Sequence, residues 1–341
     1  MKELENIDTS DMNAMVASFP QMLRSGSPSD GFLSEAERIQ KRGIDGICLI
    51  GMGGSAIAGE IVKGLLVDRA EKPILTIRDY ILPKTVNSGW IVVAVSYSGN
   101  TEETIAGYRD AESRGCSIFV LTTGGVLLEA SDESRLHVMP AGFQPRAALP
   151  IIFAGILPLV EILLNLKLTN LQEVSRNLEL AATKWDSSNL KPGSLAKSLK
   201  DKIPVLIGWK HLIPVAYRAK CQFNENSKVF ASSVQIPEMY HNEIEGTLSC
   251  KDYPISPVFL RSREEDEKTR IGIKSAAAIF EENGCRPEHL DLKFGSRIEE
   301  ILGVIMYLDL VSVRLAEIRG VDPLSVERIA QLKKRLKIRE E

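Results

Sequence analysis

The segment GICLIGMGGSAIAGE, residues 46–60, passes from an apolar run through a glycine-rich turn into a helix-like pattern of small residues. This order is typical of phosphate-binding turns in α/β proteins, because glycines let the backbone approach an anion and the following helix directs its N-terminus at it. The spacing from Gly51 to Ala56 fits the fingerprint of dinucleotide-binding folds. Alternatively, a glycine-rich turn that ends in Ser55 could hold a single terminal phosphate group.

Around this segment, from residue 47 to residue 155, short apolar runs alternate with helix-like patterns. Runs such as ICLI and IVVAV are apolar on both faces, as expected of parallel strands that are covered on both sides, whereas the intervening patterns are amphipathic. We predict strands at GICLIG, ILTIRD, WIVVAVSYSG, SIFVLTT and LHVMP. The alternation predicts a doubly wound α/β domain with a parallel sheet.

A second alternating series follows the polar segment TKWDSSNLKPGSLAK, with predicted strands at IPVLIGW, KVFAS, SPVFLR and LDLKF. A glycine ends an early strand in each half, Gly51 and Gly208, which indicates a duplicated α/β unit. The second copy lacks the glycines and serines of the first, so we expect only one phosphate site. The predicted fold class is α/β, with two doubly wound parallel-sheet domains.

The chain has 341 residues, more than one hydrophobic core usually serves. We predict a first domain over residues 1–165, with an N-terminal helical segment and the phosphate-binding turns, and a second domain over residues 166–341. Additional C-terminal helices are expected over 296–318 and 325–338. Ser325 is the candidate N-cap of the last helix.

The segment SYSGNTEET, residues 96–104, decides between the two interpretations of the glycine-rich turn. It brings Ser96, Ser98 and Thr101 to a strand end, with Gly99 permitting a tight turn and Thr101 placed to cap the next helix. Ligands of doubly wound sheets bind beyond the carboxyl ends of the strands, so this turn and the first one could converge on one phosphate. A dinucleotide fold has no use for a second hydroxyl cluster.

Two alternatives to this joint site remain. In a dinucleotide-dependent oxidoreductase Asp79 would hold a ribose, but it lies farther from the glycines than the usual spacing of about 20 residues. Each serine could also merely cap its own turn, although two hydroxyl-rich turns at successive strand ends favour a joint site. The residues that we predict to bind phosphate are Gly53, Gly54, Ser55, Ser96, Ser98 and Thr101.

The two turn motifs together resemble a sugar isomerase (SIS) domain. QPRAALP, FNENSK, EMYHNEI and DPLSVERIAQLKK resemble segments of the bifunctional phosphoglucose/phosphomannose isomerases, and the resemblance spans nearly the whole chain. The turn pair alone is shared with regulators and deaminases, whereas the NEN and HNE segments are more specific. The resemblance implies two SIS-type domains and interconversion of glucose 6-phosphate, and also mannose 6-phosphate, with fructose 6-phosphate through a cis-enediol.

Such a reaction needs ring opening, proton removal beside the carbonyl, and stabilisation of an enediolate. Glu225 alone, between two asparagines, could be a solvated turn residue; the resemblance implies that it moves the proton between C1 and C2, for which a partly buried carboxylate is suited. His241 alone could be a surface histidine. The resemblance implies a role in ring opening, for which an imidazole is suited because it can both donate and accept a proton near neutral pH. The other histidines match no motif, and His137 in a strand is expected to be structural.

Two cations complete the candidate catalytic set. Arg146 alone could be an ordinary residue at a helix start; the resemblance implies that it stabilises the enediolate charge. Lys333 resembles a family lysine that contacts the sugar, but the neighbouring Lys334 leaves the register open.

Composition limits the partners. A net charge of −3 gives no basic stripe for nucleic acid, and no apolar run has the length of a membrane span. The acidic N-terminal sequence lacks a signal-peptide pattern, so we expect a cytoplasmic protein.

The five scattered cysteines show neither metal-ligand spacing nor a disulfide framework, and we expect buried thiols, no metal and no cofactor. These cysteines are Cys48, Cys116, Cys221, Cys250 and Cys285.

The resemblance also implies a homodimer whose active sites borrow the histidine from the partner, with a phosphorylated hexose as substrate. The rival from another class is a sugar-phosphate sensor, which usually carries a helix-turn-helix domain. Fewer than fifty residues precede the first predicted strand, and they lack that pattern. The sequence does not reveal whether glucose or mannose phosphate is preferred, because the two epimers differ by one hydroxyl.

Overall fold

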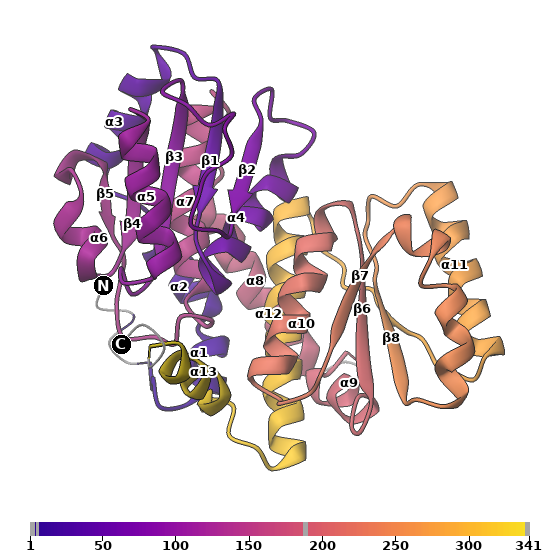
Figure 1. The fold of residues 1–341 in the computed structure, drawn as a ribbon. Helices are drawn as coiled ribbons and strands as arrows, with labels where there is room; N and C mark the ends of the chain where they lie inside the picture. Colours follow the sequence, from indigo (N-terminus) through magenta and orange to yellow (C-terminus); the bar gives the residue numbers. More distant parts are fainter. Residues whose placement is uncertain (1–3, 5–6, 187–189, 338–341) are drawn as a thin grey trace.

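The structure is a computed structural model that describes residues 4, 7–186 and 190–337. Two parallel sheets lie side by side, each with helices on its faces (Figure 1). The first sheet has the strand order β2-β1-β3-β4-β5 and the second the order β7-β6-β8-β9. The predicted α/β class, with parallel sheets and additional helices toward both ends, is confirmed.

The first sheet contains every strand predicted for the first half, because buried apolar runs flanked by turns are a strong local signal. All residues of β1 and β3 are buried. The strands are β1 (Gly46–Ile50), β2 (Ile74–Ile77), β3 (Trp90–Ser96), β4 (Ser117–Thr122) and β5 (Leu136–Val138). The helices are α1 (Met12–Ala17), α2 (Phe19–Ser25), α3 (Asp30–Gln40), α4 (Gly53–Leu66), α5 (Glu102–Ser113), α6 (Gly125–Ala130), the 3-10 helix η1 (Glu133–Arg135) and α7 (Leu149–Leu163).

The second half repeats this plan with a four-stranded sheet. Its strands are β6 (Ile203–Trp209), β7 (Ser232–Ile236), β8 (Ile255–Leu260) and β9 (Glu288–Leu290). The helices are α8 (Leu171–Asp186), α9 (Pro192–Ser198), α10 (Ile213–Glu225), α11 (Glu267–Glu282), α12 (Arg297–Arg319) and α13 (Glu327–Lys337), with 3-10 helices η2 (Lys210–Leu212), η3 (Glu238–His241) and η4 (Glu245–Lys251).

Three predicted boundaries in this half are wrong. KVFAS is mostly irregular, because Lys228 has a positive φ of 55° and β7 begins only at Ser232, the last residue of this segment. Of LDLKF only the first residue, Leu290, belongs to β9, which pairs with the last three residues of β8 and ends there. Helix α13 starts at Glu327, because the backbone N–H of Ser325 donates to the Asp322 carboxylate in a turn. The predicted end of this helix, residue 338, lies outside the described residues.

Helix α12 packs between the two halves (Figure 1). It begins with a capping box in which Ser296 and Glu299 satisfy each other's backbone N–H groups, and it ends at Gly320 in the left-handed region. Its buried residues belong to the same apolar core as the helices of the first half. The two sheets therefore share one continuous core across the predicted domain boundary.

An ion-pair cluster joins α3 to η1 in the first half. The Glu35 carboxylate accepts hydrogen bonds from Arg38 at 2.6 Å and from Arg135 at 3.0 Å. The hydrogen bond from Arg38, assisted by Arg135, lowers the pKa of Glu35 to about 2 against the opposing effect of burial. The folded state is thus stabilised by the ionised form of Glu35.

The expectation of five free thiols is wrong for two cysteines. Cys250, in η4, and Cys285, after α11, form a disulfide with their Cα atoms 5.4 Å apart. They are 35 residues apart in sequence and are brought together by the path of α11, which gives no local spacing signal. The remaining three cysteines are free. None of the helices in the described part of the chain has the length and apolar character that a membrane span requires.

Candidate active site

The glycine-rich turn joins β1 to α4 at the carboxyl edge of the first sheet. A Cβ on Gly51 would lie 2.8 Å from the carbonyl oxygen of Val95, so glycine permits the end of β1 to approach β3. Gly53 has a positive φ of 51° and is the first residue of α4. The N-cap residue Met52 provides no side-chain hydrogen bond, which leaves the N-terminus of this helix able to face an anion. Ser55 lies buried on its first turn.

The hydroxyl-rich turn follows β3, the neighbour of β1 in the sheet. The hydroxyls of Ser96 and Thr101 are 2.9 Å apart, and Ser96 also accepts from the N–H of Gly99. Gly99 has φ 70°, and a Cβ there would overlap the carbonyl oxygen of Gly124. Thr101 is the N-cap of α5, as predicted, but its side chain makes no capping bond and contacts Ser96 instead. The exposed Ser98 completes the turn.

Arg146 lies between the glycine-rich turn and the end of α10. Its Cα would be 3.8 Å from a Cβ on Gly54. The guanidinium is almost fully buried and donates to Asn226 Oδ1 at 2.8 Å and to the carbonyl oxygens of Pro323 and Leu324 at 2.6 and 3.0 Å. Burial lowers the pKa of Arg146, and the nearby Glu225 carboxylate opposes this effect. Arg146 therefore links the first half to α10 and to the segment before α13.

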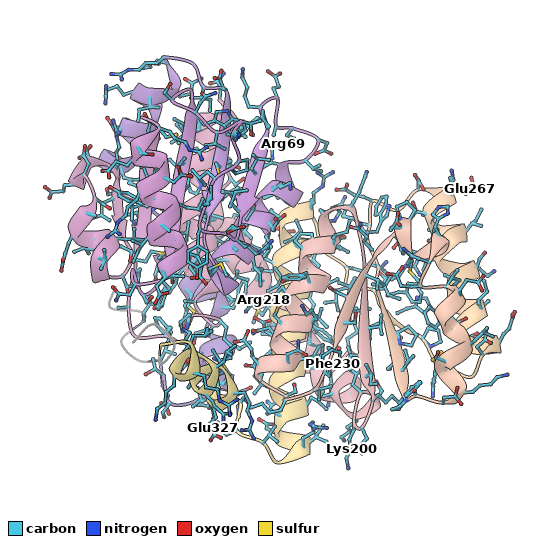
Figure 2. All side chains as sticks on the ribbon, in the orientation of Figure 1. Arg69, Lys200, Arg218, Phe230, Glu267 and Glu327 are labelled. Atoms are coloured by element: carbon cyan, nitrogen blue, oxygen red, sulfur yellow. A yellow bond between two sulfur atoms is a disulfide. The ribbon has the colours of Figure 1, made fainter. Side chains whose placement is uncertain are left out.

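Glu225 is the last residue of α10 and lines a pocket of about 840 Å³. Lys228, also in the pocket wall, donates from Nζ to the carbonyl oxygens of Glu225 and Ser325 at 2.6 and 2.7 Å. Burial and the charge of Arg146 both lower the pKa of Lys228. Phe230 and Glu327, labelled in Figure 2, line the same pocket. The pocket thus combines a carboxylate, a cation and apolar walls, as small-molecule sites do.

His241 is not in this pocket. Glu225 precedes the amino end of β7, and His241 is exposed in η3, beyond the carboxyl end of the same strand. Five strand residues span about 16 Å at roughly 3.3 Å per residue. A single chain therefore brings together Arg146, Glu225 and the glycine-rich turn, but it keeps His241 apart from Glu225.

A family model described as the bacterial phospho-glucose isomerase C-terminal SIS domain matches residues 190–336. The bifunctional phosphoglucose/phosphomannose isomerase of Aquifex aeolicus is 33% identical over 86% of this chain and 90% of its own. The chain belongs to the bifunctional phosphoglucose/phosphomannose isomerase family.

Two further comparisons show how this family varies. The D-glucosamine-6-phosphate 4-epimerase of Sulfolobus acidocaldarius is 32% identical over 85% of this chain and 88% of its own, so related chains differ in their reactions. The tagatose-6-phosphate ketose/aldose isomerase of Escherichia coli matches with a TM-score of 0.71 over 93% of this chain and 95% of its own, at 16% identity. That likeness shows a shared fold. Membership confirms the resemblance inferred from the motifs and does not favour the sensor or the dinucleotide enzyme.

Helix geometry does not choose between Lys333 and Lys334, which the sequence left as alternatives for the lysine that contacts the sugar. Both side chains are exposed on α13. Ile329 lines the pocket, and Lys333 follows it by four residues, on the same face of the helix. Glu327 also lines the pocket, and Lys334 follows it by seven residues, which at roughly 100° per residue puts Lys334 on the face of Glu327.

No role for Asn226 was evident from the sequence, but the structure places it beside Arg146 and Glu225. Its amide oxygen accepts from Arg146, and its nitrogen donates to the Ser312 hydroxyl at 2.9 Å on α12. Asn226 thus fixes the orientation of Arg146. Only its position next to Glu225 could have pointed to it. His137, expected to be structural, is buried and contacts the carbonyl oxygen of Gly26 at 3.0 Å.

Proposed function

We propose that this chain is an aldose–ketose isomerase that interconverts glucose 6-phosphate and mannose 6-phosphate with fructose 6-phosphate through a cis-enediol. The observation that carries the proposal is the position of Arg146, which packs against the glycine-rich turn on one side and lies near the Glu225 carboxylate on the other. Arg146 thus connects the turn that would hold the phosphate to the carboxylate that would act on the sugar.

In the proposed mechanism the phosphate binds at the N-termini of α4 and α5, where backbone N–H groups and the hydroxyls of Ser55, Ser96, Ser98 and Thr101 donate to it. This contact holds the sugar while the other end reacts. Glu225 removes the C2 proton of either aldose and returns it to C1. Because the two aldoses differ only at C2, both give the same enediol, and one base serves both. Arg146 supplies a fixed positive charge beside the developing enediolate.

We further propose that the working unit is a homodimer in which one protomer supplies Glu225 and the partner supplies the ring-opening histidine. Two observations support this proposal. His241 and Glu225 lie at opposite ends of β7 in one chain. Large apolar side chains near the pocket are exposed, and burying them against a second copy would be favourable. They are Phe230, Ile329, Leu332 and Leu336, with exposed fractions of 83%, 43%, 58% and 56%.

We also propose a cytoplasmic location, because phosphorylated hexoses are ionic and do not cross membranes unaided. Thiol-reducing agents there oppose disulfides in most organisms, so the Cys250–Cys285 bond would have to resist them. Fractionation of cells, followed by thiol labelling of the protein from each fraction, tests location and disulfide together. Recovery from an oxidising compartment would refute the proposed location.

The function is tested by measuring fructose 6-phosphate formed from glucose 6-phosphate and from mannose 6-phosphate, and by following separately the conversion of glucosamine 6-phosphate to its 4-epimer. We expect both aldoses to react, with or without a chelator. Glu225→Gln should lower both rates by about 10²–10⁴-fold while sugar-phosphate binding persists. Glu282→Gln is a matched control, because Glu282 ends α11 as Glu225 ends α10 and is exposed. Reaction of glucosamine 6-phosphate alone would replace the isomerase proposal with an epimerase.

A further inference from the structure

The second sheet contains a counterpart of the two turns at the phosphate edge of the first. In the first sheet β1 lies between β3 and the edge strand β2, and in the second sheet β6 lies between β8 and the edge strand β7. The turns after β6 and β8 therefore correspond to those after β1 and β3. They carry His211 in η2 and Ser262 before α11.

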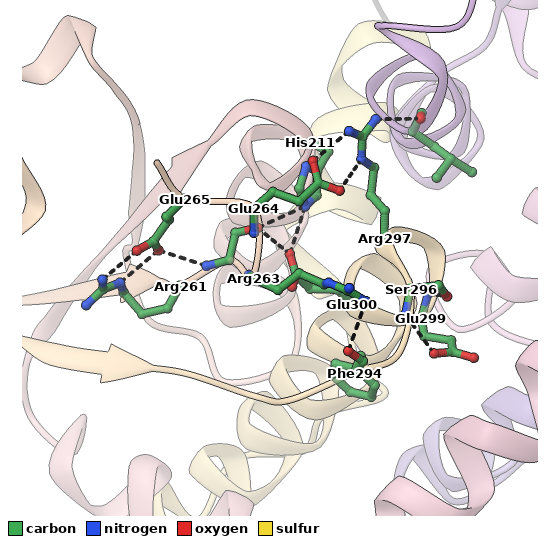
Figure 3. Close-up of polar contacts among 12 residues, drawn as sticks. His211, Arg261, Arg263, Glu264, Glu265, Phe294, Ser296, Arg297, Glu299 and Glu300 are labelled. Carbon is green, nitrogen blue, oxygen red and sulfur yellow. Dashed lines mark hydrogen bonds and ion pairs between the residues drawn. The ribbon is translucent and has the colours of Figure 1, made fainter. Parts of the chain in front are cut away.

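Donors from these two turns surround one carboxylate, that of Glu300 on α12 (Figure 3). Oε1 of Glu300 lies 2.8 Å from His211 Nε2 and accepts from the Ser262 hydroxyl at 2.7 Å. Oε2 accepts from the backbone N–H of Arg263 at 2.9 Å. The side chains of His211 and Glu300 are both only 1% exposed. A hydroxyl, a ring nitrogen and a backbone N–H thus converge on one buried anionic group.

Two arginines around Glu300 pair with other carboxylates. Arg297 pairs with Glu264 and with Asp68 of the first half, and Arg261 pairs with Glu265. His211 Nδ1 is buried and has no hydrogen-bond partner among residues 4, 7–186 and 190–337. No arginine side chain contacts the Glu300 carboxylate among these same residues. The Glu300 carboxylate is instead held by hydrogen-bond donors that follow the strand ends, as a bound anion would be.

We propose that the second sheet keeps an anion-binding cradle, formed by His211, Ser262 and the N–H of Arg263, and that Glu300 occupies it as an internal ligand. A covalently attached carboxylate has a very high effective concentration at its site, so it excludes free anions. The second half therefore binds no sugar phosphate, and the start of α12 is fixed to the strand ends. Removal of the carboxylate leaves the donors buried and unpaired, and a free small carboxylate such as acetate can satisfy them.

The test is chemical rescue of Glu300→Ala by acetate, followed as the melting temperature at constant ionic strength set with chloride. We expect this variant to melt well below the wild type. At 100 mM acetate its melting temperature should rise by ~3 °C or more beyond any change in the wild type, since a ligand that binds only the folded state stabilises it. Glu300→Gln keeps the cradle filled and should show no such rise. Adding Ser262→Ala to Glu300→Ala removes one donor and should weaken the rescue.

If Glu300→Ala is not recovered folded, the same comparison is made on its refolding from urea with and without acetate. A folded yield that increases with acetate, but not with neutral acetamide, supports the cradle. Equal acetate effects on Glu300→Ala, Glu300→Gln and the wild type would overturn it. A Glu300→Ala variant as stable as the wild type would also overturn it, because unpaired donors would then carry no cost.

Discussion

Removing the disulfide between Cys250 and Cys285 is expected to destabilise the second half of the molecule. The two cysteines are 35 residues apart, and the bond closes a loop of that length. In the chain-entropy description, closing such a loop lowers the entropy of the unfolded chain by about 13 cal/mol/K, which corresponds to about 4 kcal/mol at 25 °C. At about 2–4 °C per kcal/mol for a unit of this size, the melting temperature should fall by roughly 8–15 °C.

The perturbation is the double substitution Cys250→Ser, Cys285→Ser, compared with the wild type before and after reduction. The assay is thermal unfolding, together with thiol titration of the denatured, unreduced protein. Three reactive thiols are expected in the wild type, those of Cys48, Cys116 and Cys221. Reductant should lower the melting temperature of the wild type toward that of the double variant and leave the variant unchanged. Replacing Cys116 and Cys221 by serine is the matched control and should preserve the response to reductant.

Two results would refute this reasoning. Titration of five thiols in the unreduced wild type would mean that no bond forms and that the expectation from the sequence was right. A double variant that melts within about 2 °C of the oxidised wild type would mean that the loop is already restricted in the unfolded chain, so that closing it removes little entropy.

Further expectations concern the site and the charge pairs. Mixed dimers of Glu225→Gln and His241→Ala subunits should regain activity, since one hybrid pocket has both groups intact; no recovery after proven subunit exchange would reject the shared site. If Lys333 contacts the sugar, as the family resemblance implies, Lys333→Ala should raise KM or lower kcat by about tenfold or more, the loss of one charged contact, whereas Lys334→Ala should stay near wild type; the reverse order would assign the contact to Lys334. Glu35 has a folded pKa of about 2 against 4.5 ordinarily, so its ionised form contributes at most about 3 kcal/mol above pH 4.5, and that contribution declines as pH falls toward 2. The free energies of unfolding in urea of Glu35→Gln and the wild type should therefore differ most near pH 6 and about half as much at pH 3. A difference that does not change with pH would mean that the ion pairs of Glu35 do not cause it.

The strand and helix predictions were accurate where residues close in sequence determine the element, and inaccurate where a residue far away in sequence determines it. The strands β1 and β3 are apolar at nearly every position, so burial on both faces is visible in the sequence itself. Helix α12 was predicted to within one residue at each end, because the capping box that starts it and the glycine that ends it are each local signals in the sequence. KVFAS has the composition of a strand, yet most of it is irregular, and the Lys228 side chain bonds to the carbonyl oxygen of Ser325, nearly a hundred residues away. No window of sequence around Lys228 contains that partner.

The same distinction holds for the site. The glycine and serine turns were recognisable because each is a contiguous motif at the end of a strand. The environment of Arg146 was not, since its acceptors come from Asn226 and from the segment before α13. Nor was the separation of Glu225 and His241, which are 16 positions apart in the printed sequence but are divided by the whole length of β7.

The sequence by itself determined the α/β class, the parallel sheets, the two turns and the family, because each rests on local hydrophobic pattern or on contiguous motifs. The tertiary structure decided which distant groups meet: Cys250 with Cys285, Glu300 with His211, and Arg146 with Asn226. Such contacts form when strands and helices pack at fixed distances around a dense core, and the cost of a buried polar group without a partner then selects their geometry. Because these contacts join residues that are far apart in sequence, the spacing of residues along the chain does not reveal them.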